Sequence, residues 1–279
     1  MRMIDPAIVR FSPEHLGGAV RLSRMAGWPH RPEDWQLALA LSEGFVAIGG
    51  SGEVVGTILL TAYERDCATV NMVIVDHALR GRGLGRRLMD AALELAGDLP
   101  LRLVATEEGL PLYEKLGFRA SGTILQHQGV VVDVAPPHAT EDATAADMSS
   151  IAALDRMAFG ADRGELIGRL AAVGAFAVIR RGGHVAGFAA MRGFGRGEVV
   201  GPVVAADLAD AKTLISHFMS RRGGGFLRVD TSADTGLAPW LAGTGLAHVG
   251  GGIAMARPPV EAAAARPVTT FALANQALG

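Results

Sequence analysis

Apolar and polar positions along the chain fall into short, almost wholly apolar stretches and longer amphipathic ones. Residues 45–56 carry two apolar runs around a glycine-rich turn, which predicts a β-hairpin. Residues 70–75 are almost continuously apolar, as expected for a strand buried on both faces. From about 84 to 96 the apolar residues recur at helical spacing and predict an amphipathic helix. Further strands are expected near residues 8–11 and 58–62, and further helices over 15–25 and from Pro32 onward.

The second half of the chain echoes the first. The matching segments are 176–187 with 45–56, 227–230 with 101–104, and 239–246 with 111–118. Echoes in the same order predict a tandem repeat of one α+β unit, against the alternative of chance similarity among glycine-rich hairpins. Two prolines within residues 134–142 indicate a linker, so the expected domains are residues 1–134 and 135–279.

Composition narrows the class of protein. Of 279 residues, 49% are apolar and 19% are charged, which is enough apolar material for packed cores. The net charge of −2 gives no basic excess, so neither a nucleic-acid binder nor a membrane-surface binder is expected. The single cysteine, Cys67, and eight scattered histidines predict no metal site. No signal peptide and no membrane-spanning stretch are recognised, so we expect a cytoplasmic protein, with its oligomeric state open.

Candidate chemistry is concentrated where the apolar strand at 70–75 gives way to the helix at 84–96. Residues 80–85 read Arg-Gly-Arg-Gly-Leu-Gly. Glycines at such a turn let backbone N–H groups converge on an anion, and the start of the helix adds unpaired N–H groups and partial positive charge. Together with Arg86 and Arg87 the loop carries four arginines, a combination that suits a pyrophosphate.

Other phosphate-binding loops fit this sequence less well. A dinucleotide-binding fold needs Gly-x-Gly-x-x-Gly, and here the third glycine, Gly85, comes one residue too early. A P-loop is excluded because no Gly-Lys-Ser/Thr follows. The alternative without a ligand is a glycine-rich helix cap surrounded by solvated arginines.

Residues 73–89, which contain this loop, resemble the coenzyme A signature of the GNAT superfamily of N-acetyltransferases, Arg/Gln-x-x-Gly-x-Gly/Ala. Arg80, Gly83 and Gly85 occupy its three defined positions. Residues 112–118, which read Leu-Tyr-Glu-Lys-Leu-Gly-Phe, resemble the family's second signature. The resemblance covers residues 1–130 well. It implies an α+β fold of two tandem GNAT-like domains, each a mixed, mostly antiparallel sheet flanked by helices.

The resemblance also implies a reaction, in which a primary amine attacks acetyl-coenzyme A directly and no covalent enzyme intermediate forms. Tyr113 matches the family's general acid, which protonates the departing thiolate; the alternative is that its ring only packs. The residues expected to bind acetyl-coenzyme A are Val73, Val75, Arg80, Gly81, Arg82, Gly83, Leu84, Gly85 and Arg86. The acceptor is expected to be a small-molecule amine or a peptide.

The general base and the acceptor site are harder to assign. Many family members carry a Glu on the strand before the loop, where this chain has Asn71, which takes up no proton. The candidates for the base are Glu107, Glu108, His30 and Asp34. The candidates for acceptor binding are Trp28, His30, Asp34 and Trp35, an aromatic and acidic segment that suits a cationic amine. The two tryptophans alone would suit a protein core equally well.

The second half lacks this chemistry. After the strand expected at 198–205 comes Ala-Asp-Leu-Ala-Asp-Ala, with two carboxylates and no glycine, and Leu241 stands where the first half has Tyr113. We therefore expect a degenerate second GNAT-like domain that completes the acceptor pocket or covers the sheet edge of the first. The rival functions are a non-catalytic acyl-coenzyme A sensor and a purely structural interaction protein.

Overall fold

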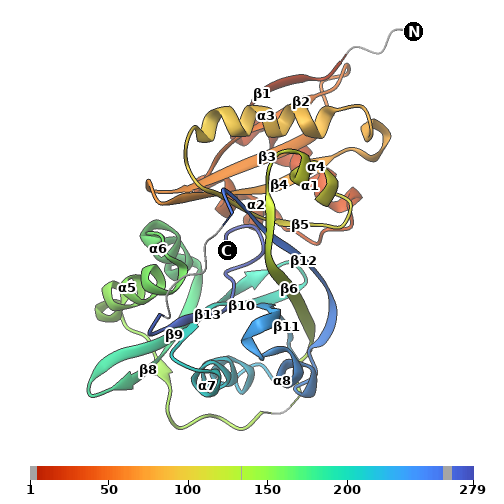
Figure 1. Cartoon of the computed structure of the whole chain (residues 1–279). Coiled ribbons are helices and arrows are strands. Elements are labelled where there is room, and N and C mark those ends of the chain that lie inside the picture. Colours follow the sequence, from red (N-terminus) through yellow and green to blue (C-terminus); the bar gives the residue numbers. More distant parts are fainter. Residues whose placement is uncertain (1–4, 133, 260–265) are drawn as a thin grey trace.

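The computed structural model describes residues 5–132, 134–259 and 266–279, and it places two halves of similar architecture side by side (Figure 1). The first half contains β1 (Ala7–Arg10), α1 (Leu16–Met25), α2 (Pro32–Ala40), β2 (Glu43–Ile48), β3 (Val54–Tyr63), β4 (Cys67–Val75), α3 (Leu84–Ala96), β5 (Leu101–Ala105), α4 (Leu110–Lys115) and β6 (Arg119–Val130). The second contains β7 (Glu141–Asp142), α5 (Met148–Phe159), α6 (Gly164–Val173), β8 (Gly174–Arg181), β9 (His184–Phe194), β10 (Gly197–Ala205), α7 (Leu208–Met219), β11 (Phe226–Ser232), α8 (Ala238–Gly243), β12 (Ala247–Arg257) and β13 (Thr269–Ala272). Short 3-10 helices lie at Pro13–His15, His77–Leu79, Ala145–Asp147 and Ala233–Thr235.

The predicted α+β fold is confirmed, and α3 has the bounds that its apolar spacing predicts. One expected break is absent, because the strand predicted to end at Gly56 and the strand predicted at 58–62 are both parts of β3. Gly56 serves packing there: a Cβ added at this position would lie 3.0 Å from the Leu88 side chain, so glycine lets α3 approach the sheet closely. The prediction that no signal peptide is present rests partly on residues 1–4, which lie outside the described residues.

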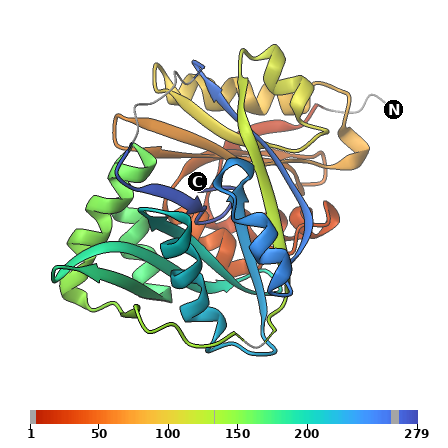
Figure 2. The same ribbon diagram turned by 60° about the horizontal axis from the view of Figure 1, so that its bottom comes forward.

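All strands belong to one sheet in which the two halves exchange strands. The order is β1-β2-β3-β4-β5-β12-β6-β11-β10-β9-β8-β7, and β13 pairs with β10. Strand β12 of the second half pairs antiparallel with β5 and β6 of the first, and β6 pairs antiparallel with β11 of the second. Figure 2 shows β6 and β12 running side by side across the middle of the molecule. Each half therefore completes the sheet of the other.

Helices cover both faces of the sheet in each half, and each of these helices buries its apolar side against the sheet. In the first half, α3 buries Leu88 and Ala92 against one face of the sheet, while α1 and α2 bury Leu22 and Trp35 against the other. In the second half α7 takes the place of α3, and α5 and α6 take the place of α1 and α2. No helix among the described residues is long and apolar enough to cross a membrane.

The last residues of the sequence form hydrogen bonds with both halves. Arg163, the residue before α6, and Asp155 of α5 form a fully buried ion pair of 2.6 Å, and the same guanidinium donates to the backbone oxygens of Leu278 and Gly279. From the first half, the Tyr63 hydroxyl donates to the Leu278 oxygen at 2.6 Å. The segment after β13 is thereby fixed between β3 and the helices of the second half.

Candidate active site

A bulge in β4 opens the sheet of the first half. The pairing of β3 with β4 shifts register between Thr57 and Leu59, and Met72, opposite this shift, has a φ of +51°. The Thr57 hydroxyl holds the bulge by donating to the Met72 backbone oxygen at 2.7 Å. Strands β4 and β5 pair in parallel up to Thr69 and Arg102 and no further along the described strands. Beyond that point β4 presents an edge that is not paired with β5.

The predicted phosphate loop lies at the end of this open strand. Gly81 and Gly83 have φ values of +72° and +81°, a left-handed conformation that side chains disfavour, and Gly83 is the residue before the first turn of α3. The first backbone bond of the helix runs from the Arg87 N–H to the Gly83 oxygen at 3.0 Å. The N–H groups of residues 84–86 therefore have no intrahelical acceptor and are available to an anion.

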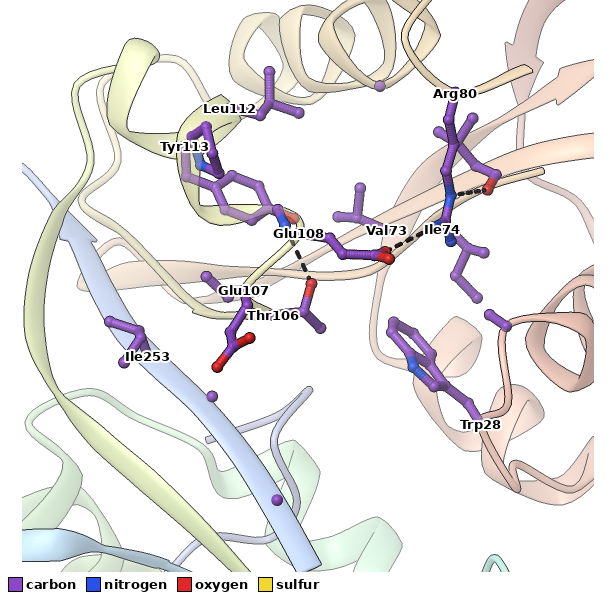
Figure 3. Close-up of a pocket in the computed structure, with 18 of the residues that line it drawn as sticks. Trp28, Val73, Ile74, Arg80, Thr106, Glu107, Glu108, Leu112, Tyr113 and Ile253 are labelled. Carbon is purple, nitrogen blue, oxygen red and sulfur yellow. Dashed lines mark hydrogen bonds and ion pairs between the residues drawn. The ribbon is translucent and has the colours of Figure 1, made fainter. Parts of the chain in front are cut away.

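A cavity of about 1040 Å³ lies between the loop, the open edge of β4, α4 and β12. Its walls include the predicted cofactor-binding residues Val73, Val75, Arg80, Gly81, Gly83, Leu84, Gly85 and Arg86. Arg82 belongs to the same loop but does not line the cavity. Figure 3 shows Leu112 and Tyr113 on one side and Arg80, Ile74 and Trp28 on the other, with Ile253 of β12 at the edge.

One ion pair spans the cavity. Arg80 Nη1 lies 2.7 Å from the Glu108 carboxylate, and its Nε donates to the Val75 oxygen at 3.3 Å (Figure 3). Both side chains are substantially exposed, so the pair contributes little to stability. Arg80 is therefore able to exchange Glu108 for a phosphate group at small cost.

Replacing Gly83 by alanine should weaken both folding and cofactor binding. The positive φ makes alanine unfavourable by about 1 to 2 kcal/mol, and its Cβ points into open space beside the anion site. Urea unfolding and calorimetric titration with acetyl-coenzyme A measure the two effects. Gly17→Ala is the matched control, because Gly17 is exposed on α1 with an ordinary φ, and alanine should stabilise there by up to about 1 kcal/mol. Equal effects of the two substitutions would contradict the assignment.

Tyr113 of α4 lies beside this cavity. Its side chain is 7% exposed, its ring packs edge-to-face on Phe118 at 6.1 Å, and its hydroxyl makes no hydrogen bond to another described residue. Burial raises the pKa of Tyr113 to about 12. The phenol is therefore fully protonated at neutral pH and has a proton to share with a group that enters the cavity.

A second, smaller cavity of about 250 Å³ adjoins the first. The residues that line both cavities are Trp28, Val73, Thr106, Tyr113 and Gly251. The second half supplies much of the rest of its wall, namely Phe194, Arg228, Asn275, Gln276 and Ala277. The second half thus completes the smaller cavity, and Tyr113 lies where the two cavities meet. That this cavity is the acceptor pocket stays a hypothesis.

The predicted acceptor segment is divided by the fold. Trp28 and His30 line the smaller cavity, whereas Asp34 and Trp35 line neither cavity. Trp35 is fully buried in the core under α1. The Asp34 carboxylate accepts from the Arg31 backbone and side chain and from the Gly195 N–H, so it fixes the chain before α2 against the β9–β10 hairpin.

The candidates for the general base differ in surroundings. Glu107 and Glu108 line the larger cavity, His30 lines the smaller one, and Asp34 lines neither. Burial lowers the pKa of His30 to about 4, with the repulsion of Arg228 and Arg192 adding to it and the attraction of Asp34 opposing it. The imidazole, whose Nδ1 lies 2.8 Å from the Ser23 hydroxyl, is therefore neutral at pH 7.

The lowered pKa of His30 predicts a pH-dependent stability. The folded protein binds fewer protons than the unfolded chain between pH 4 and 6.5, so the free energy of unfolding should rise with pH across this window. His30 contributes a slope of up to about 1.4 kcal/mol per pH unit. Urea unfolding from pH 4 to 7 should show a shallower rise in His30→Gln than in the unmodified protein. Parallel curves would contradict the burial of a neutral imidazole.

Several of the lining residues that sequence reasoning missed come from the second half. Gly250, Gly251 and Gly252 of β12 face the larger cavity, and Arg228 of β11 lines the smaller one. They reach the site only through the strand exchange, which no local pattern predicts. The three consecutive glycines within a strand were the available signal, since such a run marks a close approach of another molecule or backbone.

The corresponding opening in the second half is filled by the chain itself. Strands β10 and β11 pair in parallel at Glu198 and Val199 and then separate, as β4 and β5 do. Strand β13 enters the gap and pairs antiparallel with β10. On the other side, the Leu273 N–H donates to the Asp230 backbone oxygen at 2.8 Å and the Thr231 hydroxyl donates to the Phe271 oxygen at 2.7 Å. Leu241 is fully buried.

Comparison with known proteins identifies the family of this chain. Protein-family models of the acetyltransferase (GNAT) domain match residues 40–120 and residues 151–265, which together are more than half of the chain. The chain belongs to the GNAT acetyltransferase family and contains two such domains in tandem.

Similar proteins match most of the length of this chain. The uncharacterized N-acetyltransferase YitH of Bacillus subtilis (strain 168) is 28% identical over 242 residues, which are 84% of this chain and 84% of that protein. A crystal structure from Pyrococcus horikoshii superposes with a TM-score of 0.84 at 17% identity, covering 100% of this chain and 98% of the other. The tandem GNAT protein from the clavulanic acid biosynthesis pathway gives a TM-score of 0.63 at 16% identity, covering 94% and 98%. At these identities the two structures support the fold alone.

Proposed function

We propose that this protein is an N-acetyltransferase that moves an acetyl group from acetyl-coenzyme A to a small primary amine. The observation that carries the proposal is the junction of the two cavities at Tyr113 and Val73. A donor that extends from the phosphate loop along β4 ends at this junction, and an acceptor in the smaller cavity reaches it from the other side. A non-catalytic sensor of acyl-coenzyme A has no use for a second cavity at that point.

Acetyl-coenzyme A supplies an acetyl thioester, and residues of this chain bind and orient it. We assign the pyrophosphate to the N–H groups at the start of α3 with Arg80 and Arg86. The open edge of β4, at Val73 and Val75, offers backbone N–H groups to the pantetheine arm and to the carbonyl oxygen, where negative charge develops. The amine nitrogen forms the new C–N bond, the C–S bond breaks with its electron pair on sulfur, and the extra proton leaves the nitrogen.

We assign Tyr113 to the sulfur. A phenol with a pKa of about 12 is a weaker acid than a thiol of ordinary pKa, about 8.5. Full transfer of the phenol proton to the departing thiolate is therefore unfavourable. The hydroxyl stabilises the thiolate by donating a hydrogen bond as charge develops, and solvent supplies the proton that the free thiol finally holds.

The described residues that line the smaller cavity include no Asp or Glu to receive the amine proton, and Asn71 is neutral. The neighbouring cations disfavour an ammonium ion, so they lower the pKa of a bound amine and favour its nucleophilic form. The proton then passes to water, or through neutral His30.

Calorimetric titration of the whole protein with acetyl-coenzyme A, followed by an assay of thiol release with a panel of amines, tests the proposal. One site per chain is expected, because β13 fills the corresponding opening of the second half. Binding with amine-dependent thiol release would support the enzyme. Binding without release for any amine would favour the sensor, and an absence of binding would overturn both functions.

A further inference from the structure

The walls of the smaller cavity carry an uneven distribution of charge. Arg228 is the one formally charged side chain among its described lining residues, because His30 is neutral at pH 7. Its Nε and Nη2 donate to both oxygens of Asp230, at 2.9 and 3.0 Å, which fixes the plane of the guanidinium. Nη1 makes no hydrogen bond to any described residue, and the side chain is 12% exposed. Arg228 is thus a rigidly oriented cation with one donor edge unused.

Asp230 holds this arginine in place. It is completely buried, and besides Arg228 it accepts from Gln276 Nε2 at 3.0 Å. Gln276 also donates to Gln126 at 3.2 Å, which joins the segment after β13 to β6. Arg228, Gln126 and Gln276 all line the cavity, so its wall is a connected network of donors built mainly by the second half.

A second buried arginine lies behind Phe194, which forms part of the cavity wall. The guanidinium carbons of Arg192 and Arg228 lie 4.9 and 5.1 Å from the centre of the Phe194 ring. Arg192 is 4% exposed, and its Nε and Nη2 have no hydrogen-bond partner among the described residues. Asp34 lies 3.7 Å away, but its carboxylate already accepts from Arg31 and Gly195.

The charges around Phe194 do not balance. Three guanidinium groups, of Arg31, Arg192 and Arg228, face two carboxylates, of Asp34 and Asp230. Burial lowers the pKa of Arg192 to about 10, which reflects how poorly this cation is compensated. An uncompensated buried charge is costly, and an anion entering the adjacent cavity would offset that cost. A plain ammonium ion would increase it.

We propose that the acceptor is a small amine that also carries a carboxylate or a phosphate, with its anionic group on Arg228 and its amine at the junction beside Tyr113. This inference rests on the proposed function and narrows its substrate class. The volume of about 250 Å³ limits the acceptor to a small molecule, since cavities for drug-sized ligands begin near 300 Å³. Bidentate or single donation from a guanidinium suits both kinds of anion.

The test compares amines that differ only in the anion. The pairs are β-alanine with the amino alcohol of the same length, phosphoethanolamine with ethanolamine, and glucosamine 6-phosphate with glucosamine. Calorimetry measures binding of each to the protein saturated with coenzyme A, and thiol release from acetyl-coenzyme A measures turnover. We expect at least tenfold tighter binding of the anionic member in at least one pair, and the pair in which it appears distinguishes carboxylate from phosphate.

Two variants test whether Arg228 causes this preference for anionic amines. Arg228→Gln should weaken binding of the anionic amine at least tenfold, change the neutral amine less than threefold, and leave acetyl-coenzyme A binding unchanged. Arg222→Gln removes an exposed arginine of the same half that pairs with Glu198 outside both cavities, and should change neither amine.

The outcomes separate the two proposals. Neutral amines that bind and react as well as their anionic partners overturn the anion inference and leave the acetyltransferase standing; this comparison needs no variant to fold. A preference that survives in Arg228→Gln overturns the assignment to Arg228. Anionic amines that bind with the expected preference but give no thiol release support the anion site and overturn the acetyltransferase.

Discussion

Tyr113→Phe should lower kcat by at least about 100-fold while the Kd for acetyl-coenzyme A stays within twofold of the unmodified value. The substitution removes the hydroxyl and keeps the ring that packs on Phe118, so α4 and the cavity wall remain in place. Removing one positioned hydrogen-bond donor to a developing negative charge costs about 10²- to 10³-fold in rate. Steady-state kinetics of thiol release and calorimetry measure the two quantities.

The chain offers a matched control, because its other tyrosine is also buried but lies in neither cavity. Burial raises the pKa of Tyr63 to about 12, and its hydroxyl donates to the Leu278 oxygen. Tyr63→Phe should cost about 1 kcal/mol of stability through the lost hydrogen bond and leave kcat unchanged. If the two substitutions have equal effects on kcat, Tyr113 is a packing residue and the assignment to the sulfur is wrong.

Residues 1–134 produced without the second half should fail to form a folded monomer that binds acetyl-coenzyme A. Strand β5 would lose β12, and β6 would lose both β12 and β11. Unpaired backbone along three sheet edges exposes donors, acceptors and apolar side chains, which favours aggregation. Circular dichroism, size-exclusion chromatography and titration with acetyl-coenzyme A test this expectation.

A second experiment distinguishes the effect of removing the second half from the effect of merely breaking the chain between the halves. A protease site placed within residues 135–139, which lie between β6 and β7, would allow cleavage after folding. The two fragments should stay together through β6 and β12 and keep the affinity for acetyl-coenzyme A. A monomeric, folded first half with unchanged affinity would contradict the interdependence of the halves.

The features predicted correctly from sequence are those that local physics determines. The glycine-rich stretch predicted a turn before α3, where Gly81 and Gly83 have positive φ, and apolar spacing predicted the bounds of α3. That this turn binds phosphate stays a prediction. Trp35 was beyond local reasoning, because an aromatic residue near a helix start has the same pattern whether it faces a ligand or a core. Its neighbours in space, Phe11 and Leu59, decide the outcome.

The smaller cavity, which we propose as the acceptor site, was predicted least completely, because it is built from distant segments. Arg228 lies on a strand that borders β6 only after the two halves have exchanged strands, and Gln276 reaches it from the end of the sequence. The internal repeat correctly indicated two similar units. It gave no indication that each unit supplies the neighbouring strand of the other.

The exchange of β6 and β12 also sets the order in which the protein is completed during synthesis. Ala105 pairs with Ile253, so β5 leaves the ribosome long before its neighbour exists. At about 5–20 residues per second, the nascent first half waits several seconds or more with an open sheet edge. Such pairings of high sequence separation fold slowly. The half that carries the phosphate loop is therefore made first and finished last, and it depends on a chaperone or on its own solubility in the interval.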